Sequence, residues 1–199
     1  MEKTTRMRER EASALFTYLK PKSASWPKRL HLAEVDGKMW WTDSYLLLPA
    51  GDAMTDLLAR YNLTPEPMLC EVGRTIVRVD TNHPVNLAGL VEKYAPKRGM
   101  VDVAPLEFGG RPLVQIEATT GTQQVLWSTD GVKVTHRVDA KKVAVVEAAG
   151  GDRWRVAAKV PNAAMVRFDG KAPVGFLMSM RGVEGALGID LEQTSRVAA

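Results

Sequence analysis

Trp40-Trp41-Thr42-Asp43 is the stretch that decides the fold, because the chain uses most of it twice. Trp40, Thr42 and Asp43, followed by Asp52 and Ala53, recur 87 positions later as Trp127, Thr129, Asp130, Asp139 and Ala140, with no gap in the alignment. Self-similarity at a long fixed period is typical of duplicated structural units. The repeat therefore predicts two related halves, and chance matching in a sequence rich in Val and Ala is the competing interpretation.

A second pair of segments repeats in the same order. Ile76-Val77-Arg78-Val79-Asp80 matches Met165-Val166-Arg167-Phe168-Asp169 at an offset of 89, so we expect one small loop insertion between the two matches. The segment 90–97 is also similar to 15–22, which indicates that the same kind of helix opens both halves. We divide the chain into a first repeat at 1–83, a second repeat at 84–181 and a C-terminal tail at 182–199.

Hydrophobic periodicity predicts the elements of these repeats. Helical spacing is found over 9–19, 52–61, 85–94 and 139–149. Strand-like segments are 29–35, 38–49, 68–72, 75–80, 101–108, 113–119, 123–137, 153–160, 164–169 and 174–180. Asp36-Gly37 predicts a tight hairpin turn. Runs of strands separated by single helices are typical of helices packed on antiparallel sheets. We expect an α+β fold of two tandem repeats, with the helices packed on one face.

Length and composition indicate a folded chain. The 199 residues suit one ordinary domain or two small ones, and either can bury a core. The apolar runs at 45–48 and 143–146 are far too short to cross a bilayer, and the charged N-terminus, MEKTTRMRERE, lacks the apolar core of a secretory signal. The single cysteine, Cys70, lies in an apolar strand and cannot form an internal disulfide. We expect a cytoplasmic protein with no membrane segment. A net charge of +4 permits an anionic partner without predicting one.

The second half resembles a known family of proteins. Its segment 138–181 contains MVRFDG and ends in VGFLMSMR. It is similar to the closing third of a bacterial DNA sliding clamp domain, whose final strand ends in a Met-Pro-x-Arg-like motif. The W-x-T-D and W-S-T-D stretches resemble the A-T-D-G strand that clamp domains carry after an Asp-Gly hairpin. Clamp domains are built from repeated units with helices on one face and sheets outside, so the resemblance implies a clamp-like fold.

The chain departs from that family in length and at its end. A bacterial clamp subunit has three such domains, whereas this chain offers two smaller repeats, which argues against a ring of the usual diameter. Ser179 stands where the family motif has proline, and the chain continues beyond Arg181. The tail is either flexible or folded back, with Leu187, Ile189 and Leu191 on the apolar surface near Met178.

The helices of sliding clamps line a channel that faces DNA phosphates, which implies a basic surface here. The matching positions are Lys20, Lys22, Lys28, Arg29, Lys93, Lys97, Arg98, Lys141 and Lys142. Such charges bind phosphates without reading the base sequence, and the binding weakens steeply with salt. The simpler interpretation is that these side chains solvate helix ends, because acidic residues such as Glu9 and Glu92 lie among them.

Sliding clamps also hold short peptides of client proteins in an apolar cleft that the final strand helps to build. The corresponding residues here are Val174, Phe176, Met178, Met180 and Arg181. Methionine suits such a cleft because its flexible, polarisable side chain adapts to several partners. Core packing is the competing interpretation, because alternation places Val174, Phe176, Met178 and Met180 on one face of the strand.

The sequence shows no pattern typical of catalysis or metal binding. His31, His83 and His136 are scattered, with no further ligand at suitable spacing. The sequence also lacks a G-x-S-x-G elbow, a phosphate-binding glycine loop and an H-E-x-x-H motif. Asp43 and Asp130 occupy equivalent places in the two repeats, so capping of a turn or strand end explains them better than acid–base catalysis. We expect no enzymatic activity, no metal and no cofactor.

Three functions of different classes remain. The first is a non-enzymatic clamp-like protein, encoded by a phage or mobile element, that binds a host protein. Because AAA+ ATPases load sliding clamps, the resemblance implies an AAA+ ATPase or a replication protein as partner. The second is a processivity factor for a DNA polymerase, which must form an oligomer around DNA and bind it non-specifically. The third is an enzyme, which a deep polar pocket would identify. We expect the first, and leave the oligomeric state open.

Overall fold

The structure is a computed structural model that describes residues 2–20, 27–79, 85–94, 99–116, 120–129, 136–157 and 164–178. The helices in these ranges are α1 (Glu2–Leu19), α2 (Asp52–Ala59), α3 (Leu87–Tyr94) and α4 (Ala140–Ala148). The strands of the first half are β1 (Lys28–Val35), β2 (Lys38–Thr42), β3 (Leu46–Pro49), β4 (Met68–Val72) and β5 (Ile76–Val79). Those of the second half are β6 (Met100–Pro105), β7 (Glu107–Phe108), β8 (Arg111–Pro112), β9 (Val114–Ile116), β10 (Gln123–Ser128), β11 (His136–Asp139), β12 (Arg153–Ala157), β13 (Ala164–Asp169) and β14 (Ala172–Met178). The predicted α+β fold with an antiparallel sheet is confirmed.

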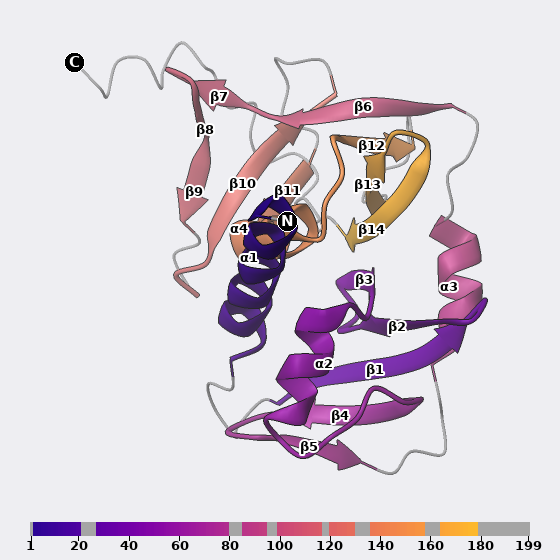
Figure 1. Cartoon of the computed structure of the whole chain (residues 1–199). Coiled ribbons are helices and arrows are strands. Elements are labelled where there is room, and N and C mark those ends of the chain that lie inside the picture. The colour runs from indigo at the N-terminus through magenta and orange to yellow at the C-terminus, as the bar shows by residue number, and fades with distance from the viewer. Residues whose placement is uncertain are drawn as a thin grey trace.

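The large sheet contains one strand order twice (Figure 1). Neighbouring strands follow the order β11-β10-β6-β12-β13-β14-β3-β2-β1-β4-β5. β9 lies outside this path and pairs with the first residues of β10, whereas β6 pairs with its last residues. The part from β3 to β5 comes from the first half of the chain, and the part from β11 to β13 has the same order in the second half. A helix follows the third strand of each set: α2 follows β3 and α4 follows β11. β14 joins the two sets by pairing with β13 and β3.

The repeated sequence motifs fall on corresponding strands, although the gap-free alignment is wrong by one residue within β2. Trp41 and Trp127 both pack in the core on the helix side of the sheet, whereas Trp40 packs on the other face. Because successive side chains of a strand point to opposite faces, Trp41 is the structural counterpart of Trp127. Asp130 lies outside the described residues, as do the proposed boundaries at 83 and 181, so the domain division stays a prediction.

Two turns determine how β1, β2 and β3 are connected. Asp36 and Gly37 both have positive φ, at 51° and 72°, as the predicted two-residue hairpin turn requires. The predicted single strand 38–49 is instead two paired strands, because the chain turns at Asp43 and Ser44. Ser44 has φ of 78°, which is uncommon for a residue other than glycine. The sequence pattern therefore missed one hairpin.

The larger core lies between the sheet and the helices α1, α2 and α4. α2 contributes Ala53, Met54, Leu57 and Leu58, which share one helical face and are all buried. Gly175 of β14 lies under side chains of both β3 and α4, because a Cβ built at this position would lie 2.2 Å from Leu48 Cδ2 of β3 and 3.2 Å from Val146 Cγ1 of α4. Glycine therefore leaves the space that the Leu48 side chain occupies at this point of the core.

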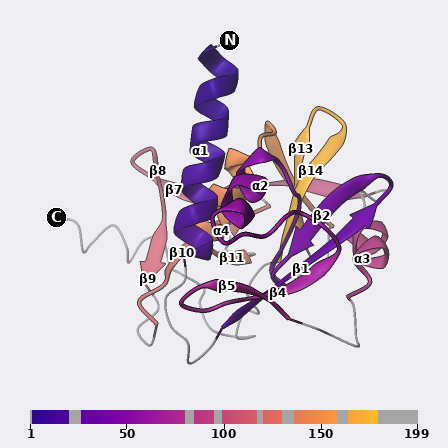
Figure 2. The ribbon, with the colours of Figure 1, turned by 60° about the horizontal axis from the view of Figure 1, so that its bottom comes forward.

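The expectation that the helices pack on one face holds for α1, α2 and α4 but not for α3. Figures 1 and 2 both show α3 apart from the other three helices. Leu87 of α3 packs with Val35, Trp40, Leu47 and Phe176 in a separate cluster. These side chains come from strand positions that alternate with those of the larger core, so α3 covers the opposite face of the sheet. No helix in the described ranges is long and apolar enough to cross a bilayer.

Candidate functional site

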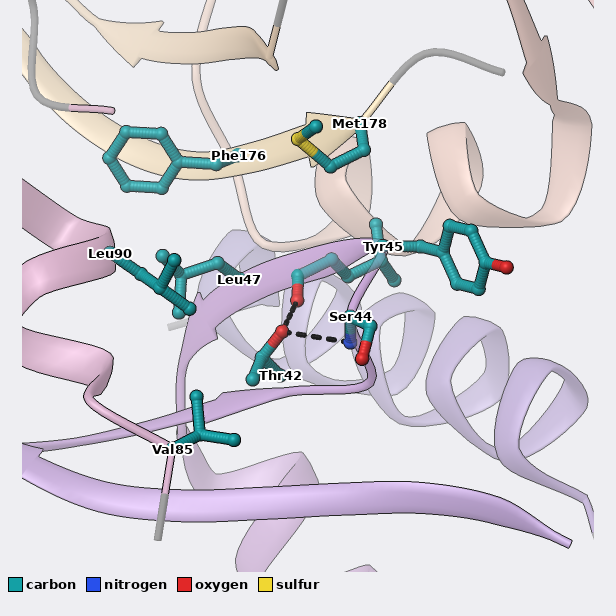
Figure 3. A pocket seen from close by; sticks show the side chains of 9 residues that line it. Thr42, Ser44, Tyr45, Leu47, Val85, Leu90, Phe176 and Met178 are labelled. Atoms are coloured by element: carbon teal, nitrogen blue, oxygen red, sulfur yellow. Dashed lines mark hydrogen bonds between the residues drawn. The ribbon is translucent and has the colours of Figure 1, made fainter. Parts of the chain in front are cut away.

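An apolar pocket lies on the face of the sheet that α3 covers, at the point where β14 pairs with β3 (Figure 3). Its volume is about 220 Å³. Its lining residues come from the turn between β2 and β3, from β3 itself, from α3 with the residues before it, and from β14. They are Thr42, Ser44, Tyr45, Leu46, Leu47, Val85, Leu90, Phe176 and Met178. The pocket is therefore built by segments from both halves of the chain.

The structure brings two of the five residues of the predicted peptide cleft into this pocket. Phe176 and Met178 line it, whereas Val174 does not. Met180 and Arg181 lie outside the described residues. The other lining residues could not be predicted, because no local sequence pattern connects the β2–β3 turn with α3 and β14.

Phe176 and Met178 play different structural roles in the pocket. Phe176 is 2% exposed, and its ring lies 6.2 Å from that of Trp40, so it belongs to the core and forms one fixed wall. Met178 is half-buried, and its backbone N–H donates to the carbonyl oxygen of Tyr45 at 2.8 Å. The competing interpretation of core packing therefore applies to Phe176, while the flexible side chain of Met178 is accessible at the pocket.

The turn beside the pocket is held by hydrogen bonds made by the side chains of Asp43 and Thr42. The Asp43 carboxylate accepts from the backbone N–H groups of Tyr45 and Leu46, at 3.0 and 2.9 Å. The Thr42 hydroxyl donates to the Leu46 carbonyl oxygen at 2.5 Å and accepts from the Ser44 N–H at 3.0 Å. These bonds fix the backbone of the turn and present Tyr45, which is 54% exposed.

The buried Asp43 also ties this turn to α1. Its second oxygen accepts a short hydrogen bond from the Tyr18 hydroxyl, and both side chains are buried. Burial raises the pKa of the Tyr18 hydroxyl well above its usual range, and the neighbouring Asp43 carboxylate acts in the same direction. The two residues therefore form a structural link, which agrees with capping as the role of Asp43.

We predict that this link makes the protein sensitive to alkaline pH. The unfolded chain releases the Tyr18 proton above roughly pH 10, while the folded protein retains it. The folded state then binds more protons than the unfolded state, so its stability falls as the pH rises through this range. Urea unfolding of the wild type and of Tyr18→Phe between pH 8 and 11 measures the effect. The stability difference between the two should shrink with rising pH, and parallel stability curves would rule the mechanism out.

Two lysines stack on the aromatic rings around this link. The Lys142 ammonium lies 3.6 Å from the centre of the Tyr45 ring, and that of Lys28 lies 3.8 Å from the centre of the Tyr18 ring. Burial lowers the pKa of the Lys142 ammonium, while Asp43 and Asp139 act in the opposite direction. Lys142 thus places a positive charge next to the exposed Tyr45 of the pocket.

The predicted DNA-facing residues do not all share one surface. Lys28 and Lys142 flank the Tyr18–Asp43 pair, and Lys20 and Lys141 are exposed next to Tyr18 and Lys142 along the chain. Arg29 is paired with Glu71 at 3.9 Å. Lys93 lies on α3, on the opposite face of the sheet. Lys22, Lys97 and Arg98 lie outside the described residues.

The remaining residues that could act as nucleophiles or metal ligands are the cysteine and the histidines. Burial raises the pKa of the Cys70 thiol, although Arg78 opposes this, so Cys70 is a poor nucleophile. Burial lowers the pKa values of His31 and His136, and Arg29 adds to the effect at His31. His83 lies outside the described residues. Among the residues that the structure describes, no three His, Cys, Asp or Glu side chains are grouped to hold a metal ion.

Comparison of the chain with models of protein families, with curated proteins and with solved structures found no match.

Proposed function

We propose that this chain is a non-enzymatic, clamp-like binding protein that holds a short apolar segment of a partner protein in the pocket between β3, β14 and α3. The observation that carries the proposal is the location of the pocket on the strand that sequence analysis singled out. Phe176 supplies a rigid wall and Met178 an adaptable one, while Tyr45 is exposed at its side. Exposed aromatic and methionine side chains are typical of surfaces that bind proteins.

The fixed turn between β2 and β3 supports this function physically. Binding is weakened when loops and side chains must become ordered, so a preformed pocket avoids part of that cost. Asp43 and Thr42 already bind the backbone N–H groups of Ser44, Tyr45 and Leu46 and the carbonyl oxygen of Leu46. A partner segment could therefore add apolar contacts to Leu47, Leu90 and Met178 without rearranging the backbone.

The partner class follows from the resemblance to sliding clamps. We propose a host AAA+ ATPase or a protein of the host replication machinery, with the chain itself encoded by a phage or mobile element and acting in the cytoplasm. The repeated strand order supports a clamp-like architecture for the chain. It does not by itself select the partner, because function resides in sites rather than in folds.

The test is affinity capture from a host lysate at moderate salt with three forms of the full-length chain. Wild type should retain a specific protein, and Met178→Glu should retain about tenfold less because it places a charge in the apolar pocket. Ile116→Glu is the matched control, since Ile116 is 63% exposed on β9, in a different part of the sheet. Equal capture by Met178→Glu and Ile116→Glu, or no specific protein with wild type, would contradict the proposal.

A DNA-encircling processivity factor is the alternative function. It is favoured by the basic residues Lys20, Lys28 and Lys141 at one end of the helical layer, where Tyr18 interacts electrostatically with Asp139. This function requires an oligomer and salt-sensitive retention on closed circular DNA. Light scattering that gives a monomer at high concentration, together with no such retention, would exclude it.

A further inference from the structure

The last residue that the structure describes, Met178, lines the pocket. Its N–H is bonded to the Tyr45 carbonyl oxygen at 2.8 Å. Residues 179–199 follow directly and lie outside the described residues. Leu187 is nine positions beyond Met178, so an extended chain could carry it as far as about 30 Å. The tail therefore starts at the pocket and is long enough to turn back into it.

The sequence of the tail matches the chemistry of the pocket. Leu187, Ile189 and Leu191 alternate with Gly188 and Asp190, so an extended segment would place the three apolar side chains on one side. Three carboxylates accompany them, at Glu184, Asp190 and Glu192. The segment 183–192 is thus an apolar stripe with negative charge.

A basic residue, Lys93, lies on the side of the sheet that carries the pocket. The Lys142 ammonium stacks on the Tyr45 ring from α4, which covers the other face of the sheet, and the Tyr45 ring points away from the other lining side chains (Figure 3). Lys93 is exposed three positions after Leu90 on α3, so the two lie on the same side of that helix. Asp43, the acidic residue of the neighbouring turn, is already bonded to Tyr18 and to the backbone. The lining of the pocket therefore suits an apolar segment, and Lys93 on the same side of the sheet is compatible with the carboxylates of that segment.

We propose that the segment 183–192 occupies the pocket of its own chain and that a partner must displace it. Displacement rests on the proposed function, whereas occupation by the tail is testable without any partner. Because the tail is covalently attached, its effective concentration at the pocket is high, on the order of millimolar. An added peptide of the same sequence then competes with a tethered copy of itself.

The experiment measures binding of a fluorescein-labelled peptide of residues 183–195 to full-length protein by anisotropy. A tail variant carrying Leu187→Asp, Ile189→Asp and Leu191→Asp should bind the peptide about tenfold or more tightly than wild type, because its own tail no longer competes. A control carrying Gln193→Asp, Thr194→Asp and Ser195→Asp adds the same charge but keeps the apolar residues, and should bind as weakly as wild type. Adding Met178→Glu to the apolar tail variant should abolish binding, whereas Ile116→Glu should not.

Each other outcome overturns the proposal. Equal affinity of wild type and the apolar tail variant, or no binding by either, means that the tail does not occupy the pocket. Binding that survives Met178→Glu places the peptide elsewhere on the protein. A dimer of wild type in light scattering that the apolar tail substitutions dissociate means that the tail docks on a second copy. If the peptide test fails but lysate capture still depends on Met178, the proposed function stands and only occupation by the tail is refuted. If lysate capture fails but the peptide competition is observed, occupation by the tail stands and only the proposed function is refuted.

Discussion

Replacing Asp43 by alanine should lower the free energy of unfolding by about 3–5 kcal/mol, the largest loss that we expect from a single polar residue. The carboxylate accepts from the Tyr18 hydroxyl and from the backbone N–H groups of Tyr45 and Leu46. Alanine leaves these donors without their acceptor, and the Tyr18 and Leu46 donors lie in buried surroundings, where an unsatisfied donor costs about 1–3 kcal/mol. Urea unfolding at neutral pH measures the change.

Two further variants separate this effect from a general loss of charge. Asp56→Ala removes an exposed carboxylate from α2 and should change the unfolding free energy by less than about 0.5 kcal/mol. Asp43→Asn keeps one oxygen for the backbone N–H groups and should fall between wild type and Asp43→Ala. If Asp43→Ala is as stable as Asp56→Ala, the turn does not depend on the carboxylate.

Replacing Gly175 by valine should lower the free energy of unfolding by about 2–3 kcal/mol, because the new side chain overpacks the core against Leu48 of β3 and Val146 of α4. A Cβ at this position meets Leu48 Cδ2 at 2.2 Å and Val146 Cγ1 at 3.2 Å. Leu48 is 3% exposed, so its side chain can move only by disturbing the surrounding core. Thermal or urea unfolding of the variant measures the cost.

A double-mutant cycle tests the cause of this loss. Leu48→Ala alone should destabilise the protein by about 2–5 kcal/mol because it leaves a cavity. In the double variant the valine side chain can enter that cavity, so the combined loss should be at least about 1 kcal/mol smaller than the sum of the single losses. Additive losses would show that Leu48 does not limit the space at Gly175.

Local patterns predicted most elements of the fold. The apolar spacing in α2 identified its buried face, and Asp36-Gly37 gave the hairpin between β1 and β2 because only a few residue types tolerate positive φ at both positions. The turn at Ser44 was missed, since its positive φ is imposed by the bonds of Asp43 and Thr42 rather than by glycine. The length of α1 was also underestimated, because its charged first turns carry no apolar stripe.

Features that depend on distant segments could not be predicted from local patterns. The gap-free repeat paired Trp40 with Trp127, but the face of a strand residue changes with a slip of one position. Periodicity identified α3 as a helix without showing which face of the sheet it covers. Phe176 and Met178 were found through the resemblance of one strand, whereas Tyr45 and Leu90 reach the same pocket only through the pairing of β3 with β14.

The most direct test of the proposed binding pocket is site-specific photo-crosslinking in cells of the proposed host. A benzoylphenylalanine at position 45 should form an adduct with a defined segment of a host protein, and the same group at position 116 should not, because Tyr45 lines the pocket and Ile116 does not. Mass spectrometry of the adduct then identifies the partner and the bound segment. A position-45 adduct that disappears on Met178→Glu is the predicted result, and identical adducts at positions 45 and 116, or none with a host protein at position 45, would contradict the account.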